Sequence, residues 1–132
     1  MFENLNVFRM AHAMAVHAGQ KQALAAENVA NSDTPDYKAR DISPFAETYD
    51  NSDIDRAAFD LKATRQTHLN GATAGMLAEP FEDPNSVASP NGNTVSLETE
   101  MLKSLQAKRQ HDRALAIYRS SMNVIRATLS RS

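Results

Sequence analysis

The sequence predicts a mainly α fold in which two long terminal helices pack as a coiled-coil-like pair around an irregular middle. Residues 3–31 contain one Gly and no Pro, and residues 97–130 contain neither, whereas residues 41–94 contain four of the five Pro and three of the four Gly. Since Gly and Pro interrupt helices, these 132 residues divide into an N-terminal helix with a turn (1–40), an irregular acidic connector (41–94) and a C-terminal helix (95–132). The two helices are expected to form one core domain, with at most a short helix and a short extended segment in the connector.

The first helix shows spacings of three and four residues, the heptad rhythm of helices that pack side by side. The positions with this spacing are Leu5, Phe8, His12, Ala15, Gly19, Gln22, Ala26 and Val29. Small residues in the middle of this series predict close approach of a partner helix. Around Met10 to Ala18 the helix is apolar on nearly every side, which predicts burial by more neighbours than one partner helix.

The last helix has a similar apolar stripe, interrupted by Lys108 and Asp112. Ser96 is a suitable N-cap, and acidic residues follow it in the first turn, where they complement the helix dipole. The stripe is expected to serve subunit packing together with Leu5, Phe8, Ala15 and Val29. It consists of Met101, Leu105, Leu115, Tyr118, Met122, Ile125 and Leu129.

Weaker patterns occur in the connector. Ser43 and Pro44 can begin a short helix that continues to Tyr49, with Ser as the N-cap and Pro at the first helical position. Residues 57–64 alternate apolar and polar side chains, which predicts a short strand. Residues 70–94 are rich in turn residues and are expected to be the flexible part of the chain.

Composition excludes several classes of protein. The chain contains no Cys, so it has neither disulfides nor thiolate sites, and its apolar runs, such as Ala13 to Val16, are far shorter than the ~20 residues of a membrane-spanning helix. No secretory signal is visible. The net charge of −2 does not favour nucleic acid, although the connector has net −6 and residues 95–132 have net +4. The basic surplus of the last helix favours a solvated or ion-paired polymer face over a nucleic-acid site.

No catalytic, cofactor-binding or metal-binding residues are predicted. His12 and His17 are five residues apart, so they miss the i, i+4 spacing of a helical zinc pair, and polar helix contacts explain them better. Asp50, Asp53 and Asp55 resemble the start of a calcium loop but lack its Gly and its final Glu. No P-loop, nucleophile elbow or dinucleotide-binding glycine motif is present.

The segment after the first helix is the most specific motif in the chain. Physically it ends a helix, because Asn side chains satisfy terminal backbone groups and Pro35 prevents continuation. The segment also resembles the hallmark of the rod and hook family of bacterial flagellar axial proteins, in which a helix ends in Asn-hydrophobic-Ala-Asn and Thr-Pro-Gly-Tyr follows. The matching residues are Asn28, Ala30, Asn31, Ser32, Thr34, Pro35 and Tyr37. Asp36 replaces the usual Gly; Asp accepts left-handed backbone better than most residues, so the turn is expected to persist while its type stays open.

Within that family the chain resembles the short proximal rod subunit. The supporting segments are Lys-Ala-Arg-Asp-Ile at 38–42, Thr-His-Leu at 67–69 and Asn-Gly-Asn-Thr-Val at 91–95. The resemblance covers about residues 5–70 and 91–130. It implies a structural subunit and not an enzyme, without cofactors, that is exported through the flagellar type III export apparatus without a cleaved signal and polymerises helically in the periplasmic rod of the basal body.

The partners implied by the resemblance are further copies of the chain, the other rod subunits and the adaptor protein that joins the rod to the membrane ring. Nucleic acid binding and direct membrane insertion are not expected. Three alternatives remain: a paralogous rod or hook subunit, a small helical export adaptor or chaperone that forms a stable cytoplasmic dimer, and a His-dependent metalloenzyme that binds stoichiometric metal.

Overall fold

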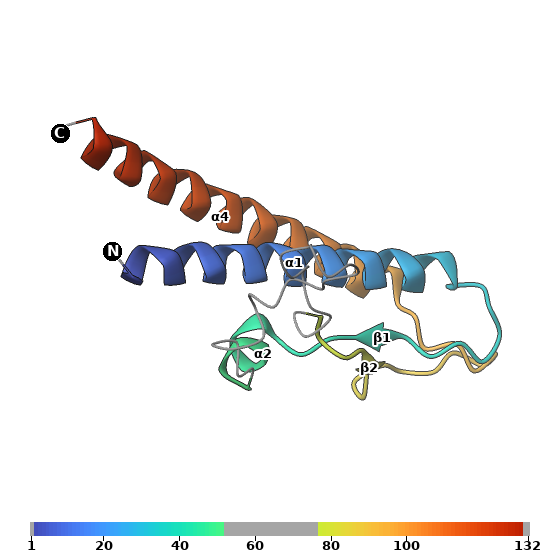
Figure 1. Ribbon diagram of the computed structural model, residues 1–132. Coiled ribbons are helices and arrows are strands. Elements are labelled where there is room, and N and C mark those ends of the chain that lie inside the picture. Colours follow the sequence, from blue (N-terminus) through green and yellow to red (C-terminus); the bar gives the residue numbers. More distant parts are fainter. Residues whose placement is uncertain (1, 52–76, 131–132) are drawn as a thin grey trace, which may run out of the picture.

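The computed structural model describes residues 2–51 and 77–130 and confirms a mainly α fold. Figure 1 shows two long helices, α1 (Phe2–Ala30) and α4 (Leu97–Leu129), that run antiparallel and lie side by side. They are closest near the C-terminal end of α1 and diverge toward the two chain termini (Figure 1). Each helix is longer than the average helix of a globular domain.

The contact between α1 and α4 is made by small residues. Ala11, Ala18 and Ala25 are buried at intervals of seven residues on α1. On α4 the buried residues also recur every seven residues, and they are Glu100, Ala107 and Ala114. Alanine allows the two backbones to approach closely, as the heptad pattern predicted, although it buries little apolar area per residue.

The predicted packing positions on α1 are wrong by one residue for this intramolecular contact. His12, Gly19, Gln22 and Ala26 are exposed, and Val29 is 40% exposed. The buried residues Ala11, Ala18 and Ala25 each lie one position before His12, Gly19 and Ala26 of the predicted series. Phe8 and Ala15 are half-buried, and the side chain of Leu5 lies outside the part of the chain that the structure describes.

A thin layer of short elements packs against the other side of α1. It contains β1 (Arg40–Asp41), α2 (Phe45–Asn51) and β2 (Phe81–Glu82), and Figure 1 shows it along one flank of α1. The two strands are antiparallel, with Arg40 opposite Glu82 and Asp41 opposite Phe81. A small apolar cluster of Leu24, Ile42 and Ala78 joins this layer to α1.

Two sequence predictions about helix ends are confirmed. The short helix α2 follows Ser43 and Pro44 as expected, and the Thr48 N–H donates to the Pro44 carbonyl oxygen at 3.1 Å. Ser96 caps α4, since its side chain accepts a hydrogen bond from the Thr99 N–H, and Glu98 and Glu100 occupy the first turn.

The connector is more ordered than the sequence suggested. The expected strand at 57–64 lies outside the described residues, but residues 77–94, expected to be flexible, form β2 and a series of turns. The Gln20 amide holds this segment on α1, because its Oε1 accepts the Ala78 N–H at 2.9 Å and its Nε2 donates to the Ala78 carbonyl oxygen. The division into segments 1–40, 41–94 and 95–132 stays a prediction.

The helices of residues 2–51 and 77–130 lack any stretch that is apolar and long enough to cross a lipid bilayer.

Candidate functional site: the turn junction and the open helix faces

The predicted motif forms a compact turn at the end of α1. Asn31 closes the helix, since its Nδ2 donates to the Glu27 carbonyl oxygen at 2.9 Å, and the Thr34 N–H then donates to the Asn31 carbonyl oxygen at 3.0 Å. Asp36 has φ = 59°, the left-handed conformation expected at the position of the family's Gly. The turn is therefore retained with Asp in place of Gly. It meets residues 91–95, and we call residues 28–40 together with 91–95 the turn junction.

Asn28 connects four parts of the turn junction and is completely buried. Its Nδ2 donates to the Arg40 carbonyl oxygen at 2.8 Å and to Glu100 Oε2 at 3.0 Å. Its Oδ1 accepts from the Arg40 N–H at 3.0 Å and from the Tyr37 hydroxyl at 3.2 Å. All the hydrogen-bonding capacity of the amide is used, so Asn28 fixes the end of α1 against β1, the turn and α4.

Asn93 plays the corresponding part from the second chain segment and is 2% exposed. Its Nδ2 lies within hydrogen-bond distance of three carbonyl oxygens of the turn. These belong to Asn31 (2.8 Å), Ser32 (2.9 Å) and Thr34 (2.7 Å). Its Oδ1 accepts from the Val95 N–H at 2.7 Å, just before α4 begins. The segment that leads into α4 thus supplies a donor to the carbonyl oxygens that follow α1.

Backbone contacts complete the turn junction. The Asp36 N–H donates to the Asn91 carbonyl oxygen at 3.1 Å, and Thr94 forms hydrogen bonds with Tyr37 (3.0 Å) and Ala39 (2.8 Å). Gly92 has φ = 80°, and a Cβ atom there would overlap the side chain of Asp36. Two left-handed residues therefore lie against each other, and one of them must be Gly.

A largely buried ion-pair cluster joins α4 to β1 and to the residue that follows β2. Lys103 Nζ lies 2.8 Å from Asp83 Oδ2, 3.0 Å from Asp41 Oδ2 and 3.3 Å from Glu100 Oε1. Burial alone lowers the pKa of Lys103, but the hydrogen bonds to Asp83 and Asp41 outweigh it and raise that pKa above the usual value. The hydrogen bond from Lys103 lowers the pKa of Asp83. Both shifts favour the charged forms of Lys103 and Asp83, and the cluster holds the strand pair on α4.

His17 makes a helix contact, as the sequence interpretation predicted. It is buried, with Nε2 2.8 Å from the Ser43 carbonyl oxygen and Nδ1 3.2 Å from Gln110 Nε2. Nε2 therefore carries the proton and donates, while Nδ1 accepts from Gln110, which is the neutral form of the ring. Burial lowers the pKa of His17 and favours this neutral form.

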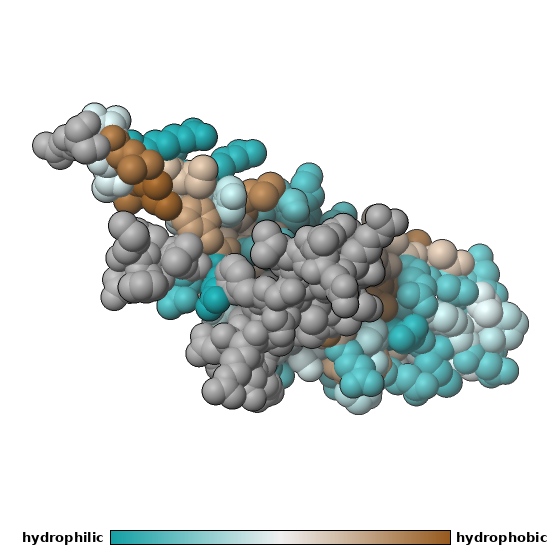
Figure 2. Space-filling view, in the orientation of Figure 1, coloured by the Kyte–Doolittle hydropathy of each residue, from teal (hydrophilic) through white to brown (hydrophobic). Residues whose placement is uncertain are grey.

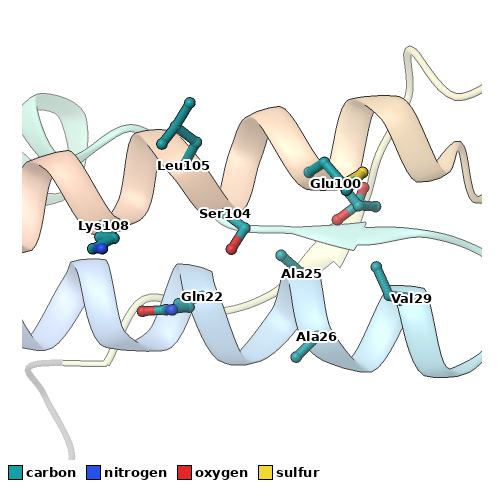
Figure 3. Close-up of a pocket in the computed structure, with 9 residues that line it drawn as sticks. Gln22, Ala25, Ala26, Val29, Glu100, Ser104, Leu105 and Lys108 are labelled. Carbon is teal, nitrogen blue, oxygen red and sulfur yellow. The ribbon is translucent and has the colours of Figure 1, made fainter.

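The residues predicted for subunit packing lie mostly at the surface of the chain. Val29, Met101 and Leu105 line a groove of about 430 Å³ between the two helices. Figure 3 shows Ala25 and Val29 of α1 directed toward the groove and Glu100, Ser104 and Lys108 across from them on α4. The groove wall is mainly apolar, although it lies open on the outside of the helix pair.

The rest of the predicted stripe follows α4 toward the C-terminus. Leu115 and Tyr118 are exposed, Leu129 is 69% exposed, and Met122 and Ile125 are half-buried. Apolar side chains are visible along this half of α4 in Figure 2. Phe8 and Tyr118 do meet, edge to face, with ring centroids 5.1 Å apart. The stripe as a whole does not pack within the chain, so its role in contacts between subunits stays a prediction.

Three functional residues escaped sequence reasoning. Glu100 was assigned only to the first turn of α4, yet it is buried between Asn28 and Lys103. Lys103 was counted only in the charge of the helix. Asn93 carried a signal, since it lies in the Asn-Gly-Asn-Thr segment that supported the resemblance, but its partners are about 60 residues away in the sequence.

Residues 2–51 and 77–130 hold no group of three His, Asp or Glu side chains arranged for a metal ion. The buried side chains of Asn28 and Asn93 in the turn junction are engaged with other side chains and with the backbone, so they fix its geometry.

Comparison with known proteins supports this structural interpretation. No protein-family model matches the chain. Curated relatives nevertheless confirm the class that the turn motif indicated, because the chain is similar to flagellar basal body rod proteins over nearly its whole length.

The relatives are more specifically rod proteins named FlgB. The one from Agrobacterium fabrum is 27% identical over 130 residues, which cover 96% of this chain and 95% of the relative. FlgB of Buchnera aphidicola is 25% identical over 124 residues, 92% of this chain and 93% of its own. FlgB of Aeromonas hydrophila is 25% identical over 112 residues, which cover 85% of this chain and 83% of the relative. The resemblance to the short rod subunit is therefore confirmed.

Proposed function

We propose that this chain is a structural subunit of the proximal rod of the bacterial flagellar basal body. It polymerises helically in the periplasm, where the rod transmits torque and encloses the export channel. Its partners are further copies of itself, the other rod subunits and the adaptor protein that joins the rod to the membrane ring. It reaches the periplasm through the flagellar type III export apparatus and carries out no catalysis. The three relatives named FlgB support this proposal.

One structural observation carries the assembly part of the proposal. Most large apolar side chains of the predicted α4 stripe are exposed, with Met101 at 70% and Leu129 at 69%. Full burial of such a side chain is worth about 1.5–3 kcal/mol, and contiguous exposed apolar surface marks interaction sites. Burial of these exposed apolar side chains between subunits therefore supplies a driving force for polymerisation.

The turn junction has a different role in this proposal. Asn28 and Asn93 set the angle and register of the two helices within each subunit. A helical polymer requires every subunit to present its contact faces in the same relation, because an error repeats in each copy. The turn junction supplies that uniform geometry, and the exposed apolar side chains of α4 supply the contacts.

A charge placed among the exposed apolar side chains of α4 tests the proposal. Leu129→Asp leaves the isolated chain nearly unchanged because the position is exposed, whereas burial of an unpaired carboxylate in the rod costs several kcal/mol. In a flagellated bacterium lacking its own copy, the variant is expected to be exported but to form no rods and no swimming cells. Asn123→Asp is the matched control, since Asn123 is an exposed polar residue on the same helix.

The measurements are the amount of secreted protein, basal-body microscopy and swimming. Normal rods with Leu129→Asp would show that this face is solvent-exposed in the assembly. A wild-type chain that never leaves the cytoplasm and forms a stable dimer there would instead indicate an export adaptor.

A further inference from the structure

The charges of the molecule are separated along its long axis. Residues 108–126 of α4 are basic, and their exposed charged residues are Lys108, Arg109, Asp112, Arg113, Arg119 and Arg126. The opposite end, where the turns and strands lie in Figure 1, exposes mainly acids: Asp33, Asp36, Glu79, Glu82 and Glu98. Asp83 and Glu100 are paired with Lys103 inside the chain, so neither is counted in this exposed acidic charge.

Each end also exposes apolar side chains beside its charges. On α4, Leu115, Arg119, Arg126 and Leu129 follow one another at spacings of four, seven and three residues, which places them on one face. We call these four residues the basic face. At the other end Phe81 is 42%, Leu97 52% and Val87 86% exposed beside Glu82 and Glu98. We call these five residues together with Glu79 the acidic end.

We propose that the basic face of one subunit docks on the acidic end of a second copy of the same chain. Both surfaces combine apolar area with charge, and the charges have opposite sign, so the contact is complementary in both respects. The two surfaces lie at opposite ends of the molecule, which makes the contact head-to-tail. A head-to-tail contact that does not close on itself generates an open filament. The inference rests on the proposed rod function and names the contact by which copies join.

Charge-swap variants test the contact in a flagellated bacterium lacking its own copy. Arg119→Glu with Arg126→Glu places acids against the acidic end, and Glu79→Lys with Glu82→Lys places bases against the basic face. Each double variant is expected to lose rods and swimming. The quadruple variant restores opposite charges across the contact and is expected to regain both. Glu47→Lys, an exposed reversal on α2 outside both surfaces, is the matched control and is expected to swim.

Failure of the quadruple variant to assemble, with circular dichroism that shows intact helices, would overturn the contact. Swimming of either double variant would overturn it as well. If the helices of the quadruple variant are lost, cross-linking tests the contact instead. The chain has no natural Cys, so only the introduced Cys residues can react. Arg119→Cys combined with Glu82→Cys is expected to give a ladder of bismaleimide-linked multimers in isolated basal bodies, while Arg119→Cys alone gives none. Absence of the ladder would contradict the contact.

Two further outcomes distinguish this contact from a failure of the rod function and from membrane binding. Wild-type protein that fails to restore swimming would refute the rod function itself, before the contact is considered. Phosphatidylglycerol vesicles test the competing partner, since a face with apolar and cationic residues also suits an anionic membrane. A membrane partner would be indicated if the wild type binds these vesicles in a salt-sensitive way and the Arg119→Glu, Arg126→Glu variant does not. That result, together with a failed charge swap, would assign the basic face to a membrane and overturn the proposal.

Discussion

The two ends of the helix pair are held in opposite ways. At the turn junction, buried amides such as Asn28 and Asn93 are saturated with hydrogen bonds inside the chain. At the other end the helices diverge, and large apolar residues such as Leu129 lie exposed (Figure 1). Buried polar networks specify one arrangement because an unpaired member is costly, whereas exposed apolar faces accept any complementary partner.

This contrast shows how a chain with a small core can still be specific. The described apolar cluster contains only Leu24, Ile42 and Ala78, and the helices meet through alanines. Such packing contributes little area, so the geometry of the subunit depends on the polar contacts of the turn junction. We expect neighbouring subunits to complete the open end, where α1 and α4 diverge. Variants at the two ends test this difference, and the largest loss of stability is expected at the turn junction.

Removal of the Asn28 side chain is expected to have the largest effect. Asn28→Ala leaves the Arg40 N–H and the Glu100 carboxylate without their partner in a buried place, which destabilises the chain by about 3 kcal/mol. Asn31→Ala is the control, since the Asn31 side chain is only half-buried and donates to its own helix, and about 1 kcal/mol is expected there. Urea unfolding followed by circular dichroism measures both, and equal losses would contradict the central role of Asn28.

A Cβ atom at Gly92 is expected to cost somewhat less. Gly92→Ala forces a left-handed alanine, at about 1–2 kcal/mol, and adds the overlap with Asp36. Asp36→Gly alone is expected to be tolerated or slightly stabilising, while Asp36→Val is strained by its β-branched side chain. Combined with Asp36→Gly, Gly92→Ala is expected to cost less than it does alone, because the overlap is relieved and only the backbone strain remains. Additive effects in this double-mutant cycle would refute the proposed crowding.

Acidification is expected to weaken the contact between α1, α2 and α4 at His17. The pKa of His17 is lowered in the folded state, so the unfolded chain binds the proton first as the pH falls below about 6.5. Stability is full above that pH and decreases as the pH falls toward the folded pKa. In a His17→Gln chain the decrease between about pH 7 and pH 5 is expected to be smaller than in the wild-type chain. An unchanged profile in His17→Gln would exclude this histidine as the cause.

The smallest effect on the isolated chain is expected at the open end. Leu129→Ser changes an exposed side chain, so the stability of the monomer is expected to change by less than about 0.5 kcal/mol. Hydrogen exchange compares the two parts of α4 directly. The backbone amides of residues 115–129 are expected to exchange faster than those of residues 100–107, which pack on α1. Equal protection along the whole of α4 in a monodisperse monomer would show that the open end needs no partner.

Local chemistry made several features predictable. The N-cap at Ser96, the helix that follows Pro44 and the left-handed Asp36 all depend on a few neighbouring residues, and each has the expected conformation. The heptad spacing indicated two packed helices, and it was wrong about the register of α1 by one residue. A periodic pattern gives the apolar side of a helix but does not distinguish an intramolecular contact from an adjacent face that is left for another chain.

From the sequence alone, the two helices, the N-cap of the second, the turn that ends the first and the class of protein could be predicted. Only the tertiary structure decided what the polar residues do. Asn28 and Glu100 are 72 positions apart in the chain, and Lys103 meets both Asp41 of β1 and Asp83, which follows β2. The physical reason is that caps and turns are short-range and their residues recognise their own backbone, whereas the partners of a buried amide or ammonium depend on how distant segments are brought together.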